Sequence, residues 1–497
     1  MEKILLFGTG IFYANRKVAL ADVLGDDKIV GFLDNHSSAG QVIDGRPVYL
    51  PKEIREVSYD RILLMSNSVH EMREQLLEMD VPAEKISFFG EYRAQKVRGT
   101  FQLPVVVKDG RPSVLMLSDE MKYDGASVVL TFAARALQRR GYQVTISAPY
   151  MHPDMEAELQ SNGITFVCCP TIPYLSATEE TWIAQYDILL VNVFSNIRVA
   201  CTMRRMMPTF WWIHDAGEPY ANNYPSMRYQ FHAHDSEREM DGIHVMAVSR
   251  LAASVFLRHY PSVSIGVMPY GIPDTWDKWN MVGGRPVFAI IGYCDANKGQ
   301  REFLDAVRIL KEGHPDVAAE FWIIGAQSSS AYGREVVERA QALSCVKCKG
   351  VLTRSEMEEA YRYIDVVVCA SHEEMLSTVC VEGLMHAKVC LTVRNNGLVS
   401  YLADGVNAFV CEDNQPGHLA SAMERVLAAK QQWQSIGACG RKVYERHFSI
   451  EKFGERLERE LDHCKMNYKK LKNKKRGGNQ KLINFELSTM EGCKCSA

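Results

Sequence analysis

The sequence predicts an α/β protein in which two Rossmann-like domains face each other across a cleft and a smaller Rossmann-like domain precedes them. Short apolar runs that suit buried strands alternate with helical stretches over most of the chain, which indicates parallel sheets with right-handed crossovers. The pattern starts afresh after the polar link Lys108–Pro112 and again near the middle of the chain. We therefore expect domains over 1–100, 111–275 and 276–463, followed by a basic tail over 464–497.

The composition narrows the classes of function. Of the 497 residues, 47% are hydrophobic and 24% are charged, as in ordinary soluble globular proteins, and a net charge of −3 provides no field that would attract nucleic acid. The opening MEKILLFGTG predicts a strand and a glycine turn, not a signal peptide, and no apolar stretch is long enough to span a membrane. The 14 cysteines are scattered through apolar segments, which favours a reducing, cytoplasmic location.

The first 100 residues predict a small parallel sheet whose first strand, KILLF, is followed by a helix over 11–24. Gly8 and Gly10 begin a dinucleotide-binding fingerprint, and Asp34 ends the second strand, near the place of the ribose-binding acid. Tyr13 occupies the third glycine position, so the fingerprint is incomplete. The segment resembles the small Rossmann-like domain found beside sugar-modifying enzymes, which implies either nucleotide or nucleotide-sugar binding or a purely structural role.

The second domain begins with the strand SVLMLS and the loop MKYDGASVV, which opens a helix that we expect to end at Arg140. Gly125 in this loop permits a close backbone approach, although Asp124 places an acid beside it. The buried strand YDILLVNV follows, and a later strand, TFWWI, ends at His214. Because ligands collect at the carboxyl ends of strands in open α/β sheets, His214 is a candidate functional residue.

The third domain repeats the order of strand, loop and helix, and the loop in IIGYCDANKGQ ends at Lys298. Its organising segment is CASHEEMLSTVCVEGLMHA, where the buried strand DVVVCAS passes through a loop into a helix whose expected N-cap is Ser377. The unpaired N–H groups and dipole of such a helix suit a diphosphate. Thr378 and Glu382 share one helix face, and Glu374 in the loop is free to face a sugar.

This segment resembles the paired-glutamate motif of retaining nucleotide-sugar glycosyltransferases of the GT-B fold (glycosyltransferase family four, group 1 type). In that family the first glutamate contacts the donor sugar and the second the ribose, which implies these roles for Glu374 and Glu382. The resemblance also implies that a final helix crosses back to the preceding domain. It assigns two sets of positions, a catalytic set of His214, Lys298 and Glu374 and a donor-binding set of Gly125, Leu376, Ser377, Thr378 and Glu382.

The chain departs from the family pattern at several positions. Met375 and Ser377 stand where glycines are usual, and Tyr293 stands where the family places an arginine on the donor diphosphate. Arg394 is a candidate for the missing positive charge, and the departure at Tyr293 puts donor binding in doubt.

We therefore expect transfer of a sugar from a nucleotide-diphosphate sugar, with retention of configuration, to a surface glycan or a lipid-linked sugar, as in polysaccharide biosynthesis. Fixed protein charges serve this chemistry, so no cofactor and no metal are expected. A non-catalytic module that binds nucleotide-sugars or a partner enzyme remains an alternative, and so does a nucleotide-sugar 2-epimerase of the same fold.

The tail over 464–497 is rich in lysine and lacks apolar periodicity, which predicts disorder. It could simply aid solubility. It could also bind anionic lipid head groups at the inner face of a membrane, where each basic residue contributes roughly 1 kcal/mol.

Overall fold

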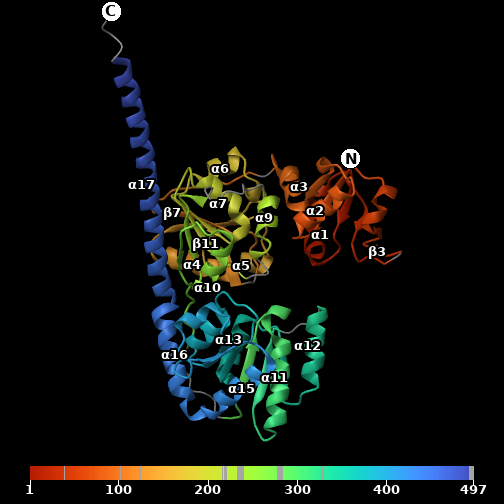
Figure 1. The fold of residues 1–497 in the computed structure, drawn as a ribbon, viewed down its shortest axis with the longest axis vertical. Helices are drawn as coiled ribbons and strands as arrows, with labels where there is room; N and C mark the ends of the chain where they lie inside the picture. Colours follow the sequence, from red (N-terminus) through yellow and green to blue (C-terminus); the bar gives the residue numbers. More distant parts are fainter. Residues whose placement is uncertain are drawn as a thin grey trace, which may run out of the picture.

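The computed structural model describes residues 1–38, 40–100, 102–122, 125–214, 217, 221–231, 240–276, 284–325 and 330–491, with the backbone alone at 229 and from 474 onward. Three α/β units, each built on one sheet, are seen in Figure 1, with a long C-terminal helix along the side of the second and third. Each sheet lies within one of the ranges expected for the three domains, and the ranges themselves stay a prediction.

The first sheet has the strand order β3-β4-β2-β1-β5-β6, and all of its pairs are parallel except β3 with β4. The helix expected over 11–24 has these bounds in the structure. The elements are β1 (Lys3–Phe7), α1 (Ile11–Leu24), β2 (Lys28–Leu33), β3 (Val42–Ile43), β4 (Arg46–Tyr49), β5 (Arg61–Leu64), α2 (Val69–Glu78), β6 (Ile86–Phe88) and α3 (Phe89–Val97).

The second sheet is parallel throughout, in the order β13-β12-β11-β10-β7-β8-β9. Its central strands are buried along their whole length, as expected of a parallel sheet covered on both faces. The elements are β7 (Ser113–Leu117), α4 (Gly125–Arg139), β8 (Gln143–Ala148), α5 (Pro153–Ser161), β9 (Thr165–Cys168), α6 (Ala177–Ile183), β10 (Ile188–Asn192), α7 (Ile197–Met203), β11 (Thr209–Ile213), α9 (Tyr224–Gln230), β12 (His244–Ala247), α10 (Arg250–His259) and β13 (Ile265–Val267).

The third sheet is also parallel, in the order β16-β15-β14-β17-β18-β19. Its elements are β14 (Val287–Ile291), α11 (Gln300–Gly313), β15 (Glu320–Ile324), α12 (Ala331–Gln341), β16 (Val346–Gly350), α13 (Arg354–Tyr363), β17 (Val366–Cys369), α14 (Thr378–Met385), β18 (Val389–Val393), β19 (Phe409–Cys411), α15 (Pro416–Ala428) and α16 (Trp433–His447). Short 3₁₀ helices are η1 (Pro51–Glu56), η2 (Ala83–Lys85), η3 (Ile172–Tyr174), η4 (Phe194–Asn196), η6 (Ala296–Lys298), η7 (Gly397–Tyr401) and η8 (Lys430–Gln432).

Helix α17 (Ile450–Glu491) crosses back from the third unit and packs against α4 of the second (Figure 1). The side chains of Phe453, Leu457 and Leu461 are fully buried, and the Phe453 ring stacks on Trp212 with 5.4 Å between ring centroids. This is the crossing helix that the family resemblance implies. One hydrophobic cluster runs from the second unit through α17 into the third, so these units are packed together.

The chain passes between the second and third units twice, and the two crossings lie side by side. The N–H of Ile272 in the first crossing donates to the carbonyl of Phe448 in the second, over 2.9 Å. The Tyr444 hydroxyl donates to the Ile272 carbonyl, over 3.0 Å.

Helix α17 continues to Glu491, into the range 464–497 where a disordered tail is expected, and that expectation stays a prediction. Lysine, leucine, glutamate and glutamine form helices readily, and the packed first turns of α17 remove the cost of starting one. Within the described ranges, no helix combines the length and apolar character that crossing a bilayer requires.

Candidate active site

A cavity of about 910 Å³ lies where the carboxyl ends of the second and third sheets meet. This volume is in the range of roughly 300–1,000 Å³ that is usual for small-molecule sites. The cavity is lined from the second unit by Lys122, Gly125 and His214, and from the third by Tyr293, Lys298, Glu374, Leu376, Ser377, Thr378 and Glu382. All catalytic and donor-binding residues that the sequence predicts therefore line one cavity.

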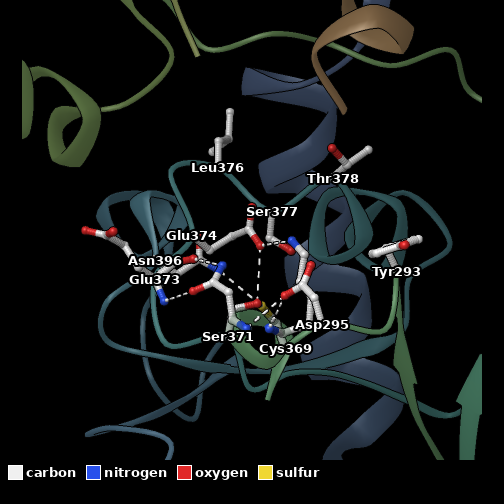
Figure 2. A network of polar contacts seen from close by, with 12 residues as sticks. Tyr293, Asp295, Cys369, Ser371, Glu373, Glu374, Leu376, Ser377, Thr378 and Asn396 are labelled. Carbon is white, nitrogen blue, oxygen red and sulfur yellow. Dashed lines mark hydrogen bonds and ion pairs between the residues drawn. The ribbon is translucent and has the colours of Figure 1, made fainter. Parts of the chain in front are cut away.

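The floor of this cavity is the loop between β17 and α14, shown in Figure 2. Ser377 is the N-cap of α14, as expected, and its hydroxyl accepts a hydrogen bond from the Cys380 N–H over 3.2 Å. The side chains of Leu376 and Thr378 project to the same side of the loop (Figure 2). The amino end of α14, with its unpaired N–H groups, therefore opens into the cavity and favours an anion there.

The Lys298 ammonium lies 2.7 Å from a carboxylate oxygen of Glu374. The Ser371 hydroxyl donates to the same oxygen over 3.2 Å. Burial alone would lower the pKa of Lys298, but the charge of Glu374 and its hydrogen bond raise it above the ordinary value. Lys298 therefore carries its positive charge at neutral pH.

Glycine and a capping aspartate bring Lys298 to this position. The carboxylate of Asp295 accepts hydrogen bonds from the N–H groups of Asn297 (2.8 Å) and Lys298 (3.2 Å), which starts η6. Gly299, with φ of +74°, follows at once, and a side chain there would collide with the carbonyl oxygen of Ala370 at the end of β17. Only glycine thus lets the η6 loop lie directly against the strand that leads to Glu374.

The loop that carries Glu374 is held from behind by Asn396. Its amide donates to the Thr392 hydroxyl over 2.8 Å, and the Gly397 N–H donates to the Glu374 carbonyl over 2.9 Å. A side chain at position 397 would collide with the carbonyl oxygen of Met375. These contacts fix the backbone of the loop, so the Glu374 side chain is presented to the cavity from a rigid support (Figure 2).

Glu382 lies one turn after Thr378 and is partly buried. The Tyr361 hydroxyl donates to its carboxylate over 2.8 Å. Burial raises the pKa of Glu382, although the bond from Tyr361 and the charge of Arg354 act in the other direction. Glu382 also lines a neighbouring cavity of about 1,070 Å³ that reaches Leu352 and α13. It therefore stands between the two cavities.

His214 follows β11 and is 8% exposed, with its ring 4.3 Å from that of Trp212 between centroids. Burial lowers the pKa of His214 to about 3, so the imidazole is neutral at physiological pH. Its Nε2 has no hydrogen-bond partner among the described residues. A neutral imidazole with one open ring nitrogen can exchange a hydrogen bond with a ligand hydroxyl.

Sequence reasoning missed the role of Tyr270, which lies in the crossing segment after β13. Its buried hydroxyl donates to the Leu376 carbonyl and lies 2.8 Å from both this oxygen and the Thr378 hydroxyl. The tyrosine therefore ties the second unit to the amino end of α14. A signal existed in the sequence, because Tyr270 stands in the MPYGI segment where the family usually has asparagine.

Lys122 was also missed. It lines the cavity on the side opposite α14 and forms an ion pair with Glu120 over 3.0 Å. Glu120 pairs in turn with Arg16 of α1 over 3.1 Å. Arg394, the candidate replacement for the missing arginine, is exposed after β18 and is not among the described residues of the cavity wall. Tyr293 is 68% exposed on that wall, and Asp124 lies outside the described residues.

The predicted nucleotide-binding residues of the N-terminal unit lie just after β1 (Gly8 and Gly10) and β2 (Asp34). A carboxylate oxygen of Asp34 accepts the Thr9 N–H over 3.3 Å, and its other oxygen accepts the His36 N–H over 2.9 Å. A side chain at Gly8 would lie 2.7 Å from the Met65 carbonyl oxygen. Gly10 is the N-cap residue of α1. None of Gly8, Gly10 and Asp34 lines either cavity described above.

Two family models match parts of the chain. Residues 285–429 match the model for "Glycosyl transferases group 1", and residues 1–87 match "C2185-like, N-terminal". Among curated proteins, the D-inositol 3-phosphate glycosyltransferase of Paenarthrobacter aurescens (strain TC1) is 25% identical over 142 residues, which are 28% of this chain and 35% of that protein. The same enzyme of Thermobifida fusca (strain YX) is 24% identical over 123 residues, 24% of this chain and 28% of its own. The chain thus matches about a third of the length of these relatives.

Solved structures are similar over a longer stretch. A glycosyltransferase from Rickettsia africae ESF-5 superposes with a TM-score of 0.60 at 15% identity, covering 71% of this chain and 99% of that one. Anabaena Alr3699/HepE, crystallised with UDP-glucose, gives a TM-score of 0.59 at 16% identity, covering 71% of this chain and 99% of its own. The predicted fold class is therefore confirmed. The chain has an α/β GT-B fold, and its residues 285–429 are similar to the group 1 glycosyl transferases.

Proposed function

We propose that the protein is a glycosyltransferase that moves a sugar from a nucleotide-diphosphate sugar to an acceptor with retention of configuration. The observation that carries this proposal is the ion pair of Lys298 and Glu374, 2.7 Å long, beside the amino end of α14 in a cavity that Glu382 also lines. A cation, a helix terminus and two carboxylates at this spacing match the parts of a nucleotide-sugar, which combines a dianion with two polyols.

In this proposal the diphosphate, ribose, base and sugar of the donor each lie beside the protein groups that suit them. The diphosphate contacts the first N–H groups of α14 and the Lys298 ammonium. The ribose reaches the Glu382 carboxylate, and the base occupies the neighbouring cavity beside Leu352. The sugar lies between Glu374 and the open nitrogen of His214, whose neutral state suits an uncharged ligand.

The chemical step separates the sugar from the diphosphate, so negative charge grows on the leaving oxygen. Lys298 and the amino end of α14 are already in place to stabilise that charge, which is the electrostatic form of catalysis. Lys122, which lines the cavity from the second unit, is the other lysine of the lining and is paired with Glu120 over 3.0 Å, while Tyr293 supplies no charge. Fixed protein charges therefore serve the reaction, and the proposal requires neither a metal ion nor a cofactor.

The acceptor that we propose is a hydroxyl of a surface glycan or a lipid-linked sugar, used on the cytoplasmic side of the membrane. We place it beside Gly125 and Lys122, which line the cavity from the second unit. The D-inositol 3-phosphate glycosyltransferases and the UDP-glucose complex named above support a nucleotide-sugar donor as a class.

Binding and turnover test the proposal in sequence. We expect UDP-, GDP- or ADP-sugars to raise the melting temperature of the wild type, with Lys298→Ala losing this shift and the surface variant Lys452→Ala keeping it. Release of the nucleoside diphosphate on addition of a glycan acceptor, with the product anomer assigned by NMR, would then establish transfer and retention. No stabilisation by any nucleoside diphosphate or nucleotide-sugar would overturn the proposal.

A non-catalytic nucleotide-sugar-binding module is the second candidate, and one observation favours it. Tyr293 is 68% exposed at the position where a second diphosphate-binding cation is expected. This candidate predicts thermal stabilisation without nucleotide release in the presence of any acceptor. A 2-epimerase would instead convert the nucleotide-sugar without an acceptor, which the same NMR experiment detects.

A further inference from the structure

A smaller cavity of about 170 Å³ lies between the N-terminal unit and the second unit. Asn67 and Phe88 reach it from the carboxyl ends of β5 and β6, and Tyr150 and Ser195 reach it from those of β8 and β10. The carboxyl edges of two parallel sheets therefore face each other here, as they do around the larger cavity. Ligands of α/β sheets bind outside these strand ends, so this is the place where a ligand is expected.

The backbone beside this cavity is held in an unfavourable conformation. Val193, at the end of β10, has a φ of +62°, which a β-branched residue rarely adopts. The surrounding structure holds it there, because its carbonyl accepts the Trp211 indole N–H over 2.9 Å and its N–H donates to the Trp212 carbonyl over 3.2 Å. Such residues cluster at ligand sites. The turn at Val193 leads directly into η4, which carries Ser195 to the cavity wall.

The buried hydroxyl of Ser195 has no hydrogen-bond partner in the part of the chain that the structure describes. The residue is 8% exposed. Buried polar groups are nearly always hydrogen-bonded, and one left unpaired reduces stability. A ligand with hydroxyl groups would supply the missing partner.

The remaining wall combines aromatic rings and neutral amides with three charged residues, Arg16, Asp119 and Glu120. The Arg16 guanidinium lies 4.3 Å from the centroid of the Tyr150 ring and pairs over 3.1 Å with Glu120, which also pairs with Lys122. Because two carboxylates and one cation line this wall, it does not favour an anionic ligand. The other residues of the wall that matter here are rings and amides, namely Phe88, Tyr174 and Phe231 with Asn67, Asn196 and Gln230.

We propose that this cavity binds a single saccharide ring. Aromatic faces suit the C–H face of a sugar, while the amides and the Ser195 hydroxyl suit its hydroxyl groups. The volume is below the roughly 300–1,000 Å³ of pockets for drug-sized ligands, which favours one ring over a nucleotide or a longer glycan. The sugar is either one unit of a bound glycan, remote from the reacting end, or a free monosaccharide.

Neighbouring and ion-paired residues link the walls of the two cavities. Asn15, next to Arg16 on α1, lines the larger cavity, while Arg16 lines the smaller one. Glu120 pairs with Arg16 from one side and with Lys122 of the larger cavity from the other. If the bound sugar is one unit of a glycan, the inference rests on the proposed function. If it is a free monosaccharide, the inference does not.

Binding of sugars to the full chain tests this proposal. We would titrate glucose, galactose, mannose and N-acetylglucosamine, each as the free sugar and as its methyl glycoside, by saturation-transfer NMR and calorimetry, with UDP present to occupy the larger cavity. We expect at least one sugar to bind the wild type. Binding of both forms would indicate a unit within a glycan, and binding of the free sugar alone would indicate a free monosaccharide.

Variants locate the site. Ser195→Ala and Asn67→Ala should each weaken sugar binding about tenfold, because each removes one hydrogen bond to the ligand. The matched controls Ser254→Ala and Asn35→Ala, exposed and outside the cavity, should bind as the wild type does. Circular dichroism confirms that every variant is folded, and UDP binding reports separately on the larger cavity.

Three results would overturn the proposal: no sugar of the panel binds, the control variants lose binding as much as Ser195→Ala does, or UDP abolishes binding. The last result would put the sugar in the larger cavity. If the wild type binds a sugar but does not bind UDP, the result would count against the proposed function and leave this inference intact.

Discussion

The hydroxyl of Tyr270 lies 2.8 Å from the hydroxyl of Thr378, the first residue of α14. The same tyrosine oxygen is 2.8 Å from the Leu376 carbonyl. The segment that leaves the second sheet is thereby joined to the helix terminus that we propose as the diphosphate site. The position of that terminus depends on a residue of the other half of the molecule.

Tyr270→Phe should therefore weaken nucleotide binding without removing a group that touches the ligand. Loss of the buried hydroxyl leaves the Leu376 carbonyl and the Thr378 hydroxyl without this partner and should lower the free energy of unfolding by about 1–3 kcal/mol. Chemical denaturation and UDP titration measure the two effects. Tyr363→Phe, at an exposed position of α13, is the control. Unchanged UDP affinity in a destabilised Tyr270→Phe would contradict a positioning role.

Lys298→Ala should reduce nucleotide release by about 100-fold or more, because the leaving diphosphate loses its nearest cation. The variant also leaves Glu374 without its ion pair, so a modest loss of stability is expected. Steady-state release of the nucleoside diphosphate measures the effect, with Lys452→Ala of α17 as the control. Turnover close to that of the wild type would show that another group neutralises the diphosphate.

The two glutamates should separate binding from turnover. Glu382→Ala is expected to weaken binding of the nucleoside diphosphate, since we place its carboxylate at the ribose. Glu374→Ala should spare that binding and abolish sugar-dependent turnover. Calorimetry with UDP and an activity assay on the same preparations give the comparison. Equal losses in both variants would refute the division of roles.

His214 should make the protein more sensitive to acid. Its pKa is about 3 in the folded chain, against an ordinary value near 6.5, so between these pH values the unfolded chain binds a proton that the folded chain does not. Stability therefore falls as the pH drops through this window, by about 1.4 kcal/mol per pH unit from this residue.

His214→Gln should remove that contribution, so the difference in unfolding free energy between variant and wild type should shift in favour of the variant as the pH drops from 6.5 to 5. Denaturation curves at several pH values measure the difference. The exposed control His152→Gln should follow the wild type. A difference that does not change with pH would mean that His214 is not buried in its neutral form.

Much of the site could be predicted because its signals are local. The capping serine at 377 and the spacing of Thr378 and Glu382 are read within one helical turn, and the structure has both as expected. The strand that leads to His214 is likewise a contiguous pattern of apolar residues. The helix over 11–24 has its predicted bounds for the same reason.

The contacts that could not be predicted join residues far apart in the chain. Tyr270 and Thr378 are 108 positions apart, and Lys122 reaches the cavity from another domain. The oxygens of Asp34 accept bonds from Thr9 and His36 of its own unit, and its place near a ribose stays a prediction. Such pairings depend on tertiary packing, which the order of residues along one segment does not specify.

The paired crossings at Ile272 and Phe448 restrict how the two halves of the GT-B fold can move. Because the two covalent connections lie side by side and are bonded to each other, sliding of one half past the other would break these hydrogen bonds, whereas rotation about the paired crossings would not. We therefore expect the two halves to open and close by hinge rotation about the paired crossings. Closure of the two halves would move Lys122 and His214 toward a ligand bound at α14. The donor would therefore bind to the third unit first and be enclosed by the second unit afterwards.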